Sequence, residues 1–186
     1  MAKSCLWLGL WLILASQMQA QINGVFVQVA GNYLAEFEQQ YAVQSQFGLR
    51  TSLGLNLGER VSTGLKIQQL WYRAYSTAGY EHFWIGGPFV RYGTSINAKA
   101  RVFGEISLSR GNFCTCDPSF RREAFRQEGL YYFVWGGGVE VRIYPGIHLN
   151  GELFFHQILN YDASTHAYNG YLLGLVFHLN KGNLSS

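Results

Sequence analysis

The stretch SQFGLRTSLGLNLGE, residues 45–59, alternates between apolar and polar side chains. One parity is apolar and the other is small or polar: Phe47, Leu49, Leu53, Leu55 and Leu57 against Gln46, Gly48, Arg50, Ser52, Gly54 and Asn56. Successive side chains of a β-strand point to opposite faces, so this alternation predicts a strand with two different faces. The direction in which the apolar face points decides the class of protein.

The same alternation recurs from Val25 to Leu179, and no stretch keeps a helical period. We therefore predict an all-β chain with eight strands, at about 22–33, 41–57, 60–75, 81–93, 98–110, 129–144, 147–159 and 167–179. The connections GE, TSIN and PG are short, EFEQQ is fairly short, and the other three are longer. Short turns on one rim and longer loops on the other are typical of an eight-stranded antiparallel up-and-down transmembrane β-barrel.

The charged residues of these strands indicate which face is inside. An Arg or Lys that faces lipid at mid-depth costs roughly 2–4 kcal/mol, so the strand charges should share the face turned away from lipid. Nearly all of them oppose the apolar parity, and we assign these to the lumen as an ion-pair network with bound water: Arg50, Lys66, Arg91, Lys99, Arg101, Glu105, Glu140, Arg142 and Glu152. The apolar parity is then predicted to face lipid.

The rest of the polar parity supports this orientation. A soluble barrel such as a lipocalin would carry many Lys, Glu and Asp residues on the face turned to water. Here the polar parity carries Ser, Gln and Asn together with glycines, namely Gly48, Gly54, Gly64, Gly104, Gly136, Gly138 and Gly174. Charged residues make up 13% of the chain, against about 25% in ordinary soluble domains. A soluble lipocalin-like binder is therefore the less favoured alternative.

Arg73 departs from the charge rule. It follows Gln68 and Gln69, where the alternation slips by one residue. We predict a β-bulge at this point, because a bulge shifts every later side chain to the other face.

Aromatic residues gather where the predicted strands meet the longer loops: Tyr33, Tyr41, Trp71, Tyr72, Tyr75, Phe83, Trp84, Tyr131, Tyr132, Trp135, Tyr161 and Tyr171. Amphipathic rings collect at membrane interfaces, so we interpret this set as an aromatic girdle. The alternative is a set of ordinary core aromatics.

The N-terminal stretch MAKSCLWLGLWLILASQMQA has the features of a cleaved secretory signal peptide. Lys3 is followed by an apolar core that is too short to span a bilayer, and small residues lead to Ala20. We expect a signal peptide at 1–20, an outer-membrane barrel domain at 21–180 and a short tail at 181–186. The 14 Lys and Arg residues only slightly exceed the 11 Asp and Glu residues, so nucleic acid is not a predicted partner.

Two segments carry a family likeness, GPFVRYGTSINAKARVFGEISLSRGN at 87–112 and GGGVEVRIYPGIHLNGELFF at 136–155. They resemble small outer-membrane β-barrel proteins common in Bacteroidetes, which are porin-like or similar to the membrane domain of OmpA. The resemblance implies an eight-stranded barrel in the bacterial outer membrane, usually with no assigned activity. It also implies a periplasmic hairpin in which Arg91 and Glu105 face the lumen, and recognition by the barrel-assembly machinery through Phe177 and Leu179.

The longest predicted loop contains Cys114 and Cys116 in a C-x-C arrangement. In an oxidising compartment the two residues could form a strained or intermolecular disulfide, stay as free thiols, or bind a metal. Two sulfurs without further ligands are weak evidence for zinc, which generally needs four ligands. We therefore predict no metal site and no cofactor, and keep the loop disulfide as an open alternative.

Several residues near the C-terminus allow an enzyme hypothesis: His148, His156, Asp162, Ser164, His166 and His178. A Ser, a His and an acid could serve a lipid A-modifying barrel enzyme. We favour instead a non-enzymatic monomer in contact with outer-membrane lipid and lipopolysaccharide, with a structural or surface-contact role through its longer loops. The second alternative is binding or passage of a small apolar ligand, although an eight-stranded barrel has an interior that side chains can fill.

Overall fold

The computed structural model describes residues 22–35, 43–74, 81–113, 126–160 and 167–180, and these form eight β-strands. The strands are β1 (Ile22–Ala35), β2 (Val43–Leu57), β3 (Val61–Ala74), β4 (Glu81–Ser95), β5 (Ala100–Phe113), β6 (Arg126–Tyr144), β7 (Ile147–Ile158) and β8 (Ala167–Asn180). Each overlaps one strand expected from the alternation, so the all-β prediction is confirmed. Among the described residues there is no helix with the length and apolar character to cross a membrane.

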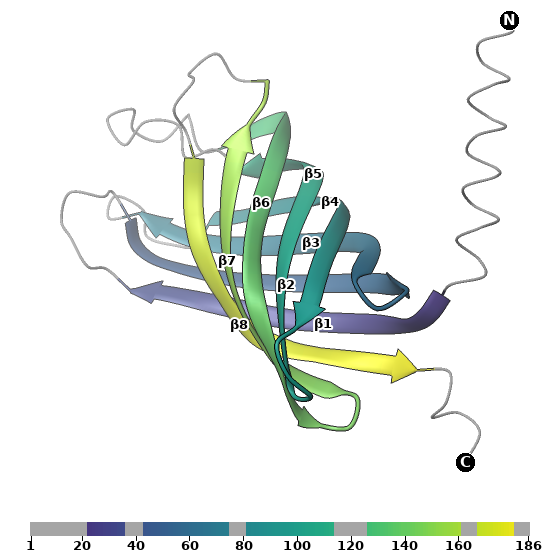
Figure 1. Ribbon diagram of the computed structural model, residues 1–186. Helices are drawn as coiled ribbons and strands as arrows, with labels where there is room; N and C mark the ends of the chain where they lie inside the picture. The colour runs from purple at the N-terminus through teal and green to yellow at the C-terminus, as the bar shows by residue number, and fades with distance from the viewer. Residues whose placement is uncertain (1–21, 36–42, 75–80, 114–125, 161–166, 181–186) are drawn as a thin grey trace, which may run out of the picture.

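The strands form a closed antiparallel barrel in sequence order. Each strand pairs with the next, and β8 returns to pair with β1, with Val27 opposite Phe177 and Val29 opposite Leu175. Figure 1 shows the first strand, in purple, beside the last, in yellow, with the strands strongly curved around the barrel. Closure pairs the edge strands with each other, which satisfies backbone groups that could not hydrogen-bond to lipid.

The short connections 58–60, 96–99 and 145–146 all lie at one end of the barrel, the end at which β1 begins and β8 finishes. We call this the short-turn end. The tightest turn joins β6 to β7 through Pro145 and Gly146. Gly146 has a φ of 78°, a left-handed conformation that glycine adopts without a steric penalty.

The predicted bulge at residues 68 and 69 is wrong. The pairing of β3 is continuous there on both sides, with Gln68 opposite Arg50 and Ile85, and Gln69 opposite Leu49 and Trp84. The alternation only seemed to slip because Leu70 is apolar yet fully buried in the interior. Arg73 keeps the parity of the outward residues near the end of β3, and its side chain lies outside the described part of the structure.

Among the residues whose burial the structure describes, three lie on the opposite face from the one that we expected. Gly104 lies on the outer face of β5, together with Val102 and Ile106. It was misassigned because glycine has no side chain to indicate which face it prefers. Phe83 and Tyr132 were expected in the aromatic girdle, but both are buried inside the barrel. Other members of that set do lie on the outside: Trp84, Tyr131, Trp135 and Tyr171.

Candidate functional site in the barrel interior

The outer surface of the barrel is apolar. Every strand contributes at least one large exposed hydrophobic side chain: Val29, Leu53, Leu65, Val90, Ile106, Val139, Leu153 and Leu173, in chain order. Leu53 is 57% exposed, Leu65 65% and Leu153 62%. Soluble proteins seldom expose a contiguous apolar surface of this kind, and a continuous apolar band is the surface that a transmembrane barrel presents to lipid.

Charged side chains occupy the interior. Among the side chains that the structure describes, three cations and three carboxylates are buried there, and each comes from a different strand of β2 to β7: Arg50, Lys66, Arg91, Glu105, Glu140 and Glu152. Arg50 is only 1% exposed and Arg91 only 2%. The charges of this cluster balance, as buried ionised groups must if they are to stay charged away from water.

Arg91 in β4 joins two of the carboxylates. Its Nε and Nη2 donate to Glu105 Oε2 at 3.0 and 2.8 Å, and its Nη1 donates to Glu140 Oε1 at 2.8 Å. Nη2 also donates to Gln28 Oε1 at 2.8 Å, which brings β1 into the network. The planar guanidinium suits this role because its five N–H groups have fixed directions.

Arg50 and Lys66 complete the cluster. Arg50 Nη1 donates to Glu152 Oε1, and its Nη2 donates to Gln68 Oε1 at 3.1 Å. Lys66 Nζ donates to Glu105 Oε1 at 2.6 Å, so Glu105 binds Lys66 with one oxygen and Arg91 with the other. The network therefore runs across the interior from β2 to β7.

Aromatic rings lie next to the two buried guanidinium groups. The Arg91 guanidinium carbon lies 4.1 Å from the centroid of Phe103, and that of Arg50 lies 4.7 Å from the centroid of Phe154. Phe26 and Phe89 lie farther from Arg91, at 5.6 and 5.8 Å. Cation–π attraction compensates part of the hydration that the guanidinium groups lose, and the rings fill space that would otherwise hold water.

Three solved structures have a similar fold. Neisserial surface protein A matches with a TM-score of 0.58 and 16% identity, covering 84% of this chain and 97% of that one. The N-terminal β-barrel domain of Pseudomonas aeruginosa OprF matches with a TM-score of 0.57 and 14% identity, over 86% and 99%. The chain has the fold of the small eight-stranded outer-membrane β-barrels.

The Yersinia pestis outer-membrane protein Ail also has a similar fold, with a TM-score of 0.52 and 11% identity, covering 84% of this chain and 99% of that one. No protein-family model matches the sequence, and no curated protein matches it significantly. At these identities the similarity establishes the outer-membrane barrel fold, and it leaves activity to be argued from the chain's own residues.

The structure does not bring Lys99, Arg101 and Arg142 into the buried cluster with the other expected residues. Lys99 and Arg142 are exposed at the short-turn end, and Arg101 is half-buried there, with its Nη2 donating to the Arg60 carbonyl at 3.2 Å. These residues lie within a few positions of a strand end, where the barrel opens to solvent. Parity in a strand determines the face of a residue but not its depth along the barrel.

Some interior residues were missed by sequence reasoning. Gln28 and Gln68 are uncharged, yet their side-chain carbonyl oxygens accept hydrogen bonds from Arg91 and Arg50. A lone Gln in the apolar run VFVQV was a signal for the first of them. Phe103 and Phe154 share the parity of Glu105 and Glu152, which places them in the lumen, but their residue type alone gave no indication that they contact the arginines.

Other predicted sites lie outside the described residues. They are the signal peptide and its cleavage position, the tail at 181–186, the Cys114 and Cys116 pair, and the loop residues Asp162, Ser164 and His166. Of the enzyme candidates that are described, His156 is buried within the barrel, where its ring contacts Phe154 and Tyr132. His148 and His178 lie at the short-turn end, beside each other.

Proposed function

We propose that this protein is an integral, non-enzymatic protein of the bacterial outer membrane, with a structural or surface-contact role through its longer loops. The observation that carries the proposal is the inverted distribution of side chains, in which ionised groups are buried inside and leucines and isoleucines are exposed outside. In water this arrangement would leave the apolar belt unfavourably hydrated, whereas in a bilayer the same belt is fully solvated.

The charged cluster supports a closed interior rather than a pore. Eight strands enclose a space that side chains can fill, and here Arg50, Arg91 and their carboxylate partners cross it. Bulky rings such as Phe26 and Phe154 occupy the space next to them. A large solute would have to separate several buried ion pairs in order to pass.

Membrane insertion and closure are testable together. The protein should fractionate with the outer membrane, require detergent for extraction, and migrate faster on a gel before boiling than after it, because the closed barrel resists unfolding. In planar bilayers it should show no stable large conductance. Recovery in the aqueous phase without detergent would contradict membrane insertion, and steady large conductance steps would contradict the closed interior.

The proposed partners are outer-membrane lipid and lipopolysaccharide, together with the barrel-assembly machinery that inserts a monomer. The surface-contact role can be tested by replacing residues 114–125 with a short turn between β5 and β6. This variant should still show heat-modifiable migration but lose binding to vesicles that contain lipopolysaccharide. Unchanged binding would count against a role for this loop, and a matched replacement of residues 75–80 controls for loop shortening in general.

A further inference from the structure

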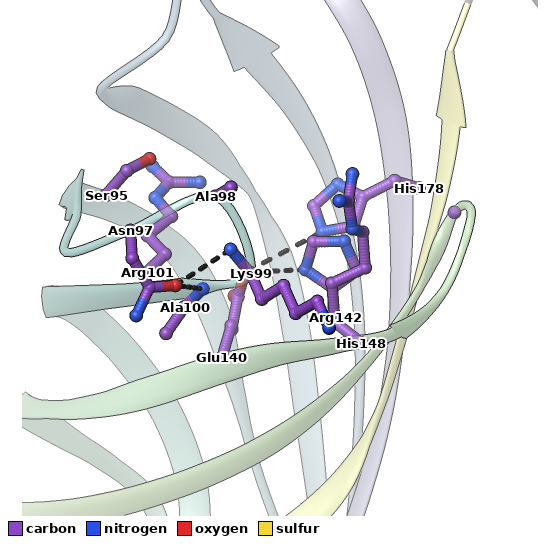
Figure 2. A pocket seen from close by; sticks show the side chains of 11 residues that line it. Ser95, Asn97, Ala98, Lys99, Ala100, Arg101, Glu140, Arg142, His148 and His178 are labelled. Atoms are coloured by element: carbon purple, nitrogen blue, oxygen red, sulfur yellow. Dashed lines mark hydrogen bonds and ion pairs between the residues drawn. The ribbon is translucent and has the colours of Figure 1, made fainter.

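A polar pocket of about 290 Å³ opens at the short-turn end of the barrel. Figure 2 shows Glu140 of β6, His148 of β7 and His178 of β8 converging on it from three consecutive strands. The function proposed above makes no use of this pocket. Its two histidines are 30 positions apart in sequence, and the antiparallel pairing of β7 with β8, which sets His148 opposite Val176, places them together.

The side chains converge through their metal-ligating atoms. One carboxylate oxygen of Glu140 and one ring nitrogen of each histidine all lie within 4.8 Å of one another. Glu140 Oε2 is 3.7 Å from His178 Nε2 and 3.9 Å from His148 Nδ1. Within the described part of the chain, none of these three buried atoms has a hydrogen-bond partner. Buried polar atoms left without partners are costly, so a bound group that satisfies all three would be favourable.

Neighbouring groups position Glu140 and His178. Arg91 Nη1 binds Glu140 Oε1 at 2.8 Å, which leaves Oε2 directed to the histidines. The backbone N–H of His178 donates to the Gly146 carbonyl at 2.7 Å, which ties β8 to the β6–β7 turn. The two imidazole rings lie with their centroids 4.4 Å apart.

We propose that Glu140, His148 and His178 form a binding site for a divalent transition-metal ion, with Zn²⁺ as the best fit. Imidazole nitrogen and carboxylate oxygen are ligands that zinc prefers, at about 2.0–2.2 Å. Tetrahedral ligands at that length are separated by about 3.4 Å. The two distances from Glu140 exceed this by a few tenths of an ångström, and the three ligand atoms are spread over up to 4.8 Å, so the imidazole rings must move towards each other to close on the ion.

The site leaves one coordination position for water from the pocket, as three-ligand zinc sites do. Three cationic side chains also line the pocket, and they oppose a metal ion: Lys99, Arg101 and Arg142. Lys99 and Arg142 are exposed, so solvent screens them, and Arg101 is directed at the Arg60 carbonyl. The repulsion between these side chains and a bound metal ion is therefore weak, but removing one of the charges should measurably raise the affinity for the ion.

The test is titration of ZnCl₂ into the barrel extracted from membranes in detergent, without a polyhistidine tag, followed by isothermal titration calorimetry. The protein should bind one Zn²⁺ per chain. His148→Ala and His178→Ala should each weaken binding by at least about tenfold, and the double variant should abolish it. Arg142→Gln should strengthen binding a few-fold, because it removes a like charge.

His82→Ala is the matched control, since His82 is an exposed strand histidine near the opposite end of the barrel from the short turns. It should bind Zn²⁺ as the unmodified protein does, and heat-modifiable migration should show that every variant is folded. Failure of the unmodified protein to bind Zn²⁺ saturably would overturn the proposal. So would a folded double variant that binds as tightly as the unmodified protein, or a loss of binding in Arg142→Gln, which would point to an anion instead.

Discussion

Arg91 is almost fully buried, and its guanidinium donates to Glu105, Glu140 and Gln28. An arginine in such a place does not stabilise a protein by its charge alone, because the lost hydration offsets much of the attraction. The stability of the folded barrel depends instead on the presence of every hydrogen-bonding partner in the buried network. Removal of one member of a buried network leaves the others uncompensated, and this loss is larger than the net value of the pair.

We therefore expect Arg91→Met to lower the free energy of unfolding by about 3–5 kcal/mol, because Glu140 loses its arginine partner and Glu105 keeps only Lys66. Urea titration in detergent micelles, followed by tryptophan fluorescence, measures the change. Arg142→Met is the control, since Arg142 is exposed and should change stability by less than about 0.5 kcal/mol. Equal effects of the two substitutions would show that the buried network does not stabilise the barrel.

At the scale of elements, adjacent strands approach closely where glycines face each other. Gly54 of β2 lies opposite Gly64 of β3. A Cβ built on Gly64 would meet the Leu53 carbonyl oxygen and lie 2.6 Å from the Gly54 Cα, and both of these are backbone atoms that cannot move aside. Glycine at position 64 is thus a requirement of the β2–β3 pairing.

Gly64→Ala should destabilise the barrel by about 1–3 kcal/mol, the usual cost of overpacking. Gly104→Ala is the matched control on another strand, because its Cβ would have only the Gly136 carbonyl oxygen nearby, at 3.9 Å. The same urea titration compares the two variants. If Gly104→Ala lowered the free energy of unfolding more than Gly64→Ala does, the close approach of β2 and β3 would not explain the need for glycine at position 64.

At the scale of the whole molecule, the two faces of every strand become the inside and outside of a closed surface. Leu53 is exposed on the outside, whereas its neighbour Ser52 is buried. Leu53→Arg should therefore block assembly in the membrane, because an arginine facing lipid costs roughly 2–4 kcal/mol at mid-depth.

Ser52→Ala should be tolerated, because it removes a small buried hydroxyl and leaves the ion pairs intact. The amounts of heat-modifiable protein recovered from membranes measure both effects. The opposite ranking would mean that the barrel has the reverse orientation of faces.

Period-two alternation was enough to locate all eight strands, because the pleat forces successive side chains onto opposite faces. Uniform parity of charges was enough to predict which face is inside at Arg50, Lys66 and Glu105. Phe83 and Tyr132 share the parity of Arg91 and Glu140 and are buried with them. They were misplaced because they were assigned by residue type, and aromatic rings are favourable both at a membrane interface and inside a barrel.

The sequence by itself determined the strands, their order and the face that the strand charges other than Arg73 take, because these depend on local periodicity and on the cost of placing a charge in lipid. Only the tertiary structure decided which charges pair and how deeply each lies. Barrel closure brings Arg50 of β2 to Glu152 of β7, and the curvature of β6, β7 and β8 brings Glu140 to His178 across the intervening strand. Those distances depend on register and curvature around the whole barrel, which no single strand encodes.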